Sequence, residues 1–160
     1  MRMRVSLGVI LAGAIIALPA AAAEDPGLAL VRKYVASWDI DAMLKEPKVV
    51  AGMNKLPANV RSKIMANLNV TPGVEYVGGY LRIEGNAPHA GGEQAAVLCI
   101  DPYGNMIHAG IYSNGAIQIY TTETRYDYVT TCVRDWVAVA NTKFAIRMTK
   151  PASVQLVTVK

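Results

Sequence analysis

The N-terminal segment constrains this chain most, because it predicts that the first 23 residues are absent from the folded protein. Two arginines and no acidic residue precede an almost wholly apolar run over Val5–Leu18, which Pro19 and Ala21–Ala22–Ala23 follow. A basic start, a short apolar stretch and an Ala-x-Ala end are the parts of a secretory signal peptide. The run is shorter than the ~20 residues that cross a bilayer. We expect a signal peptide at 1–23, cleavage after Ala23 and a soluble periplasmic chain at 24–160; the alternative is an uncleaved membrane anchor.

The remaining residues are enough for one domain with its own core. Without Arg2 and Arg4 the chain has 14 basic and 12 acidic residues, and these charges are scattered along it. Such a pattern gives no support to nucleic-acid binding. No second long apolar segment follows the first, so we expect no membrane span after signal cleavage.

The front of the chain has helical patterns and the rest has strand patterns. Helices are expected where apolar residues recur three and four positions apart. These stripes are Val31, Tyr34, Val35 and Trp38, then Val49, Val50 and Met53 within 48–55, then Val60, Ile64 and Leu68 after Pro57.

From Val74 on, β-forming residues separated by turn signals predict strands. The expected strands are 75–83 with a bulge or a close backbone approach at Gly78–Gly79, 94–101, 106–113, 116–122 after the hairpin signal Asn114–Gly115, 143–148 and 153–159, while 129–140 is apolar but of ambiguous type. Short turns between successive strands imply antiparallel pairing. The prediction is an α+β fold, an antiparallel β-sheet with the N-terminal helices packed on one face.

Cys99 and Cys132 are the only cysteines, and both lie in apolar stretches. In an oxidising compartment such a pair is a candidate disulfide, here expected to join two strands. It would close a loop of about 33 residues and stabilise the fold by about 3 kcal/mol. The alternative is two separate buried thiols.

The residues that carry out catalysis in enzymes are scarce in this sequence. It has no nucleophile elbow, no phosphate-binding glycine motif and no metal-spaced cluster of histidines and cysteines. His89 and His108 are its only histidines, and Asp101 and Asp127 are better explained as a turn residue and a solvated residue. We therefore expect no enzyme, no cofactor and no metal. An acid or nucleophile gathered with either histidine in one pocket would restore the enzyme hypothesis.

One connection between two expected strands stands apart. Its candidate target-binding residues are Asn86, Ala87, Pro88, His89, Ala90 and Gly91, and glycines flank it on both sides. Pro88 restricts the backbone, whereas the glycines permit sharp bends. The expected result is a protruding loop with His89 at its tip. An imidazole both donates and accepts hydrogen bonds, which suits insertion between two acids of another protein's active site. The alternative is an ordinary exposed loop with an incidental histidine.

A family resemblance is carried by the spacing of several short motifs. They are Lys55–Leu56–Pro57–Ala58, Pro88–His89, Gln94–Ala95–Ala96–Val97–Leu98, Asn105–Met106 and Gly110–Ile111–Tyr112. With this spacing the chain resembles the Ivy family, the periplasmic inhibitors of vertebrate-type lysozymes, over about residues 55–148. The resemblance implies an α+β sheet with helices on one side. It also implies a loop histidine, here His89, that plugs the lysozyme cleft and bonds to the catalytic carboxylates.

The chain departs from the family pattern inside that loop. Asn86 and Gly91 stand where the family has the cysteines of a small disulfide ring, and Ala90 stands where it has an aspartate. A loop without the ring is expected to lose more conformational entropy on docking.

The expected function is inhibition of a peptidoglycan-cleaving enzyme, either a c-type lysozyme or a lytic transglycosylase. Both use an acidic residue in a sugar-binding cleft. The alternative is a binding or immunity protein of the same fold that has lost this inhibition and has another protein partner. The resemblance also allows a homodimer, for or against which the residues give no argument.

Overall fold

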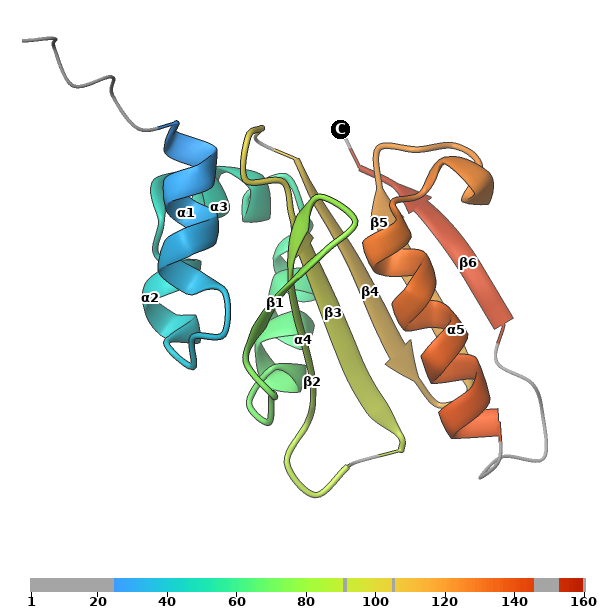
Figure 1. Ribbon diagram of the computed structural model, residues 1–160. Coiled ribbons are helices and arrows are strands. Elements are labelled where there is room, and N and C mark those ends of the chain that lie inside the picture. The colour runs from blue at the N-terminus through green and yellow to red at the C-terminus, as the bar shows by residue number, and fades with distance from the viewer. Residues whose placement is uncertain (1–24, 91, 105, 146–152, 160) are drawn as a thin grey trace, which may run out of the picture.

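The computed structural model of this chain describes residues 25–90, 92–104, 106–145 and 153–159 (Figure 1). Four helices come first, six strands follow, and a long helix precedes the last strand. The elements are α1 (Pro26–Tyr34), α2 (Ile40–Leu44), α3 (Pro47–Met53), α4 (Ala58–Asn67), β1 (Val74–Val77), β2 (Tyr80–Asn86), β3 (Gln94–Ile100), β4 (Ile107–Ser113), β5 (Ala116–Thr121), a short 3₁₀ helix (Tyr126–Tyr128), α5 (Thr131–Ala145) and β6 (Ser153–Thr158). The signal peptide expected at 1–23 lies outside the described residues.

The six strands form one sheet in the order β1-β2-β3-β4-β5-β6. Neighbours from β1 to β5 pair antiparallel, as expected from the short turns between them. β6 instead pairs parallel with β5. Parallel neighbours need a crossover connection, and α5 provides it. The predicted α+β class is confirmed, with a mostly antiparallel sheet.

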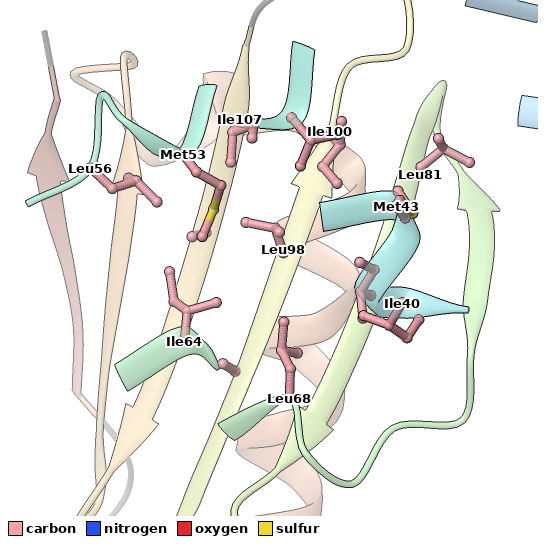
Figure 2. Packing of buried hydrophobic residues seen from close by; sticks show 14 of the residues in the cluster. Ile40, Met43, Met53, Leu56, Ile64, Leu68, Leu81, Leu98, Ile100 and Ile107 are labelled. Atoms are coloured by element: carbon pink, nitrogen blue, oxygen red, sulfur yellow. The ribbon is translucent and has the colours of Figure 1, made fainter. Parts of the chain in front are cut away.

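One face of the sheet is covered by the N-terminal helices, as predicted. The side chains of β2, β3 and β4 that point to this face interdigitate with those of α2, α3 and α4 (Figure 2). The expected stripe of α4 is confirmed, because Val60, Ile64 and Leu68 are all buried here. This packing gives β2 and β3 a firm base from which their connecting loop extends.

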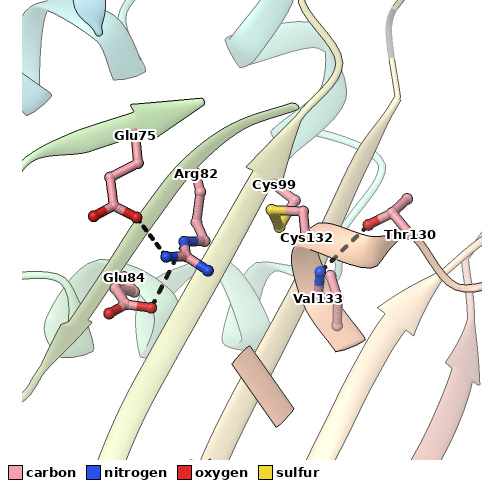
Figure 3. The surroundings of a disulfide bond; sticks show 7 residues. All are labelled: Glu75, Arg82, Glu84, Cys99, Thr130, Cys132 and Val133. Carbon is pink, nitrogen blue, oxygen red and sulfur yellow. Dashed lines mark hydrogen bonds and ion pairs between the residues drawn. A yellow bond between two sulfur atoms is a disulfide. The ribbon is translucent and has the colours of Figure 1, made fainter. Parts of the chain in front are cut away.

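The other face of the sheet is covered by α5, which lies over β3 and β4. Trp136 packs against Gly110, where an added Cβ would lie 2.6 Å from the indole ring. The expected disulfide between Cys99 and Cys132 is present, with Cα atoms 6.2 Å apart (Figure 3). It joins β3 to α5, however, and not one strand to another, because the ambiguous segment 129–140 is mostly helical.

Two of the strand predictions are wrong. Gly78 and Gly79 have φ of 57° and 87° and form the two-residue turn between β1 and β2, so 75–83 is a hairpin and not one bulged strand. Two successive residues of positive φ are the mark of a type I′ hairpin turn. The strand expected over 143–148 is also wrong where it is described, since 143–145 form the last turn of α5. Residues 146–148 lie outside the described part.

The first helical stripe is too long in the prediction. α1 ends at Tyr34, and Val35 begins an extended link to α2, which the sequence patterns did not reveal. Trp38 is 72% exposed in this link and is no part of the core. The helix-like spacing of Val35 and Trp38 is therefore incidental.

No helix within the described residues combines the length and the hydropathy that crossing a membrane requires.

Candidate target-binding loop

The connection between β2 and β3 extends past the neighbouring strand ends at the lower end of the sheet in Figure 1. Asn86 ends β2 and Gln94 begins β3. Pro88 and His89 are both exposed to solvent, whereas Gly92 is buried and bends the chain back with φ of 106°. The expected exposed loop with His89 at its tip is thus what the structure contains; Gly91 lies outside the described residues.

His89 sits in a tight turn. The N–H of Ala90 donates to the carbonyl of Ala87 at 3.1 Å, and the two residues between them are Pro88 and His89. His89 has φ of +62°. Proline at the second position and positive φ at the third are the features of a type II turn. The turn fixes the backbone that carries the imidazole.

Further backbone hydrogen bonds close the loop above this turn. The N–H groups of Glu93 and Gln94 both donate to the carbonyl of Ala90, at 3.0 and 3.1 Å, and the N–H of Ala87 donates to Gln94 at 3.3 Å. Neighbouring segments brace both ends. Asn86 exchanges two backbone hydrogen bonds with Val70, and Glu93 accepts one from Asn114 of the β4–β5 hairpin. Hydrogen bonds thus hold the loop where the family pattern has a disulfide ring.

Gly85 has a different role from the one expected of it. It lies in β2, and a Cβ there would be 2.6 Å from the carbonyl oxygen of Val70 and 2.9 Å from that of Asn67. The glycine permits close approach of the segment after α4, and it is not a bend of the loop. The bend on the other side is at Gly92.

His108 is not near the loop tip and is structural. It is 1% exposed, its Nδ1 lies 2.8 Å from Oγ1 of Thr121, and the ring of Tyr80 meets it edge-on at 5.6 Å. Burial lowers its pKa, and the charges of Glu123 and Asp101 oppose that shift only in part. The two histidines are therefore not gathered in one site.

The two aspartates also have the structural roles expected of them. The Asp101 carboxylate accepts from the N–H of Tyr103 at 2.8 Å in the β3–β4 turn, and Asp127 is exposed beside Arg125. Within the described residues, no group of three or more histidine, cysteine, aspartate or glutamate side chains is placed to hold a metal ion.

Comparison with known proteins places this loop within a region that matches a family model. Residues 48–143, more than half of the chain, match the family model described as inhibitor of vertebrate lysozyme (Ivy). The chain belongs to the Ivy family. No curated protein and no solved structure matches it. Ivy proteins are inhibitors and not enzymes, so the non-enzyme prediction is confirmed by family membership.

The Ivy match runs from α3 to α5. It takes in β1 to β5, the β2–β3 loop and both cysteines, but neither α1 and α2 nor β6. The part of the fold that positions His89 is therefore the part that the family shares.

A small cavity of about 180 Å³ lies at the base of the β2–β3 loop, and the sequence patterns did not reveal it. It lies between α5 and β2. Its lining includes Val70 and Pro72 before β1, Glu84 and Asn86 of β2, and Trp136 and Val139 of α5. These residues come from three separate segments, so no local spacing could have indicated the cavity.

Proposed function

We propose that this Ivy protein inhibits a c-type lysozyme by inserting the β2–β3 loop into the enzyme's active-site cleft, with His89 against the catalytic carboxylates. The observation that carries the proposal is the position of His89. It is exposed, at the tip of a projecting loop, on a backbone fixed by a tight turn and a hydrogen-bonded base.

The chemistry of the target favours an imidazole at this point. Retaining glycosidases hold two carboxyl groups about 5–5.5 Å apart. A histidine ring has two nitrogens that point in different directions, and both donate when the ring is protonated. One ring placed between the two acids can therefore bond to both and exclude the substrate.

The missing loop disulfide bears on affinity. The family's ring keeps the loop from losing entropy when it docks, since about 1–2 kcal/mol is lost for each residue ordered. Here the turn at Ala87–Ala90 and the braces at Asn86 and Glu93 are formed before the target is met. This preorganisation supports inhibition although the loop lacks the two cysteines of the family's disulfide ring.

A turbidity assay tests the proposal. Residues 24–160 are titrated against a c-type lysozyme acting on bacterial cell walls, with a lytic transglycosylase in parallel. We expect inhibition of the lysozyme, and a loss of at least about 30-fold with His89→Ala, the size of a central interface residue. Glu93→Gln, at the other end of the loop, is the control and should inhibit nearly as well as the unaltered protein.

Three results would change the assignment. Equal inhibition by the His89→Ala variant would show that the loop tip is not the inhibitory element. A folded protein that inhibits neither enzyme would favour the alternative, an Ivy-fold binding or immunity protein with another partner. Inhibition of the transglycosylase alone would keep the mechanism and change the target.

We also propose a periplasmic location after cleavage at Ala23. The support is the basic and apolar N-terminus, the Ivy family and a disulfide of the kind that persists in oxidising compartments. Mass spectrometry of the protein from a periplasmic extract should give a chain that begins at Glu24. An intact N-terminus in a membrane fraction would contradict this.

A further inference from the structure

We propose that the cavity at the base of the β2–β3 loop receives a lysine or arginine side chain of the lysozyme while His89 occupies the catalytic cleft. This inference rests on the proposed function, and adds a second anchor point to it.

The cavity lies within reach of the same interface. Asn86 lines it and is also the residue from which the loop departs, three residues before His89. Three residues span at most about 10 Å. A standard interface covers about 800 Å² of each partner, so a footprint centred on the loop tip extends beyond the cavity mouth. Val70 and Val139, exposed by 53% and 59%, add apolar surface at that mouth.

The size and walls of the cavity fit a single long side chain. At about 180 Å³ it is smaller than the 300–1,000 Å³ of typical small-molecule sites. Val70, Pro72, Trp136 and Val139 contribute apolar side chains to a lining whose remaining surface is largely polar. Such a lining suits the methylene stem of a lysine or arginine, which buries its stem and keeps its charge near a polar group.

The charge in the cavity selects a cation. Glu84 is the only ionisable residue of the lining. Its carboxylate is 3.8 Å from Nε of Arg82, too far for a hydrogen bond, and the same guanidinium is bonded to Glu75 (Figure 3). Two carboxylates thus share one guanidinium, and the cluster keeps a net negative charge. An apolar occupant would desolvate Glu84 without compensation, and an anion would be repelled.

A comparison of two glutamate variants tests this inference. Isothermal titration of c-type lysozyme is carried out with the unaltered protein, Glu84→Gln and Glu75→Gln, after urea unfolding has shown that all are folded. We expect Glu84→Gln to weaken binding by about tenfold or more, because one partner of a desolvated charge pair is lost. Glu75→Gln removes the same charge from the same Arg82 cluster but does not line the cavity, and should weaken binding less than about twofold.

The lysozyme side chain is identified by a further arm of the experiment. Acetylation removes the charge of lysine and leaves arginine unchanged. If the loss caused by Glu84→Gln disappears with acetylated lysozyme, the occupant is a lysine; if it persists, the occupant is an arginine.

The failures of the two proposals are distinguishable. If the unaltered protein binds lysozyme and Glu84→Gln binds equally well, or if both variants weaken binding to the same extent, the cavity anchor is wrong and the loop mechanism stands. If the unaltered protein does not bind lysozyme at all, both proposals are overturned.

Discussion

His89 adopts a left-handed backbone conformation that residues other than glycine rarely adopt. A left-handed conformation costs such a residue roughly 1–2 kcal/mol, although histidine tolerates it better than most residues do. Its φ of +62° is maintained by the turn hydrogen bond between Ala90 and Ala87. Strain of this kind collects at functional sites. The strained backbone of His89 agrees with a side chain whose role is binding and not stabilisation of the fold.

We therefore predict that His89→Gly separates function from stability. Glycine adopts positive φ without strain, so the free energy of unfolding should stay constant or rise by up to about 1 kcal/mol. Inhibition should be lost, because the imidazole is gone. Thermal unfolding and the turbidity assay on the same sample measure both effects. A variant that loses both stability and inhibition would point to a structural role for the histidine.

The second histidine, His108, makes the fold sensitive to acid. Its pKa is lowered by burial in the native state, while in the unfolded chain it is about 6.5. As the pH falls below about 6.5, the unfolded state takes up the proton first. Stability is therefore lost from that pH downwards, until the native pKa is reached.

The corresponding variant is His108→Gln, which cannot titrate. We predict that it is less stable than the unaltered protein at pH 7.5, since it fills a fully buried site beside Thr121 less well. The difference in free energy of unfolding should narrow between pH 7 and pH 5.5, because only the unaltered protein loses this contribution. Urea unfolding at several pH values measures it. A difference that stays constant with pH would contradict a neutral buried His108.

At the scale of elements, the disulfide attaches α5 to the central strand β3. Cys99 and Cys132 are both fully buried, and the bridge closes a loop of 33 residues. It acts on the unfolded chain by restricting the conformations that this loop can take. The bridge lies in the shared core of the sheet and α5, away from the loop tip.

We predict that removing the bridge lowers the free energy of unfolding by about 3–4 kcal/mol. Urea unfolding of Cys99→Ala/Cys132→Ala, compared with the oxidised protein, measures this loss. A change below about 1 kcal/mol would show that packing of α5 alone holds it on the sheet. Mass spectrometry under non-reducing conditions provides the control that the unaltered protein is oxidised.

Some elements could be predicted from local patterns and others could not. The hairpin at Asn114–Gly115 was predictable, because both residues favour the positive φ that they adopt. The segment 129–140 was not, because Val133, Trp136 and Val137 make a helix face while its neighbours read equally well as a strand. At Gly78–Gly79 the sequence predicted a bulge or a close backbone approach and not a turn, because glycines within a run of β-forming residues are compatible with all three.

At the scale of the whole molecule, the sheet lies between two layers of helix, and the loop extends from one end of it. Of the two strands that carry the loop, β3 is buried on both faces and β2 is paired with it along its length. A projecting loop on such a base is the arrangement by which rigid scaffolds present binding residues. The exposed loop was predictable from Pro88 and Gly92, whereas the part expected of Gly85 was wrong. The hydrogen bonds that brace its ends and the cavity at its base depend on Val70, Asn114 and Trp136, which only the tertiary structure brings near.

The central claim, that the loop occupies the lysozyme cleft, is tested most directly by competition. Binding of residues 24–160 to c-type lysozyme is measured by titration calorimetry with and without a saturating N-acetylglucosamine oligomer in the active site. Our account predicts that the apparent association constant falls in proportion to the fraction of clefts that the sugar leaves free, as mass action requires for a shared site. An affinity unchanged by the oligomer would place the protein elsewhere on the enzyme and contradict the role given to His89.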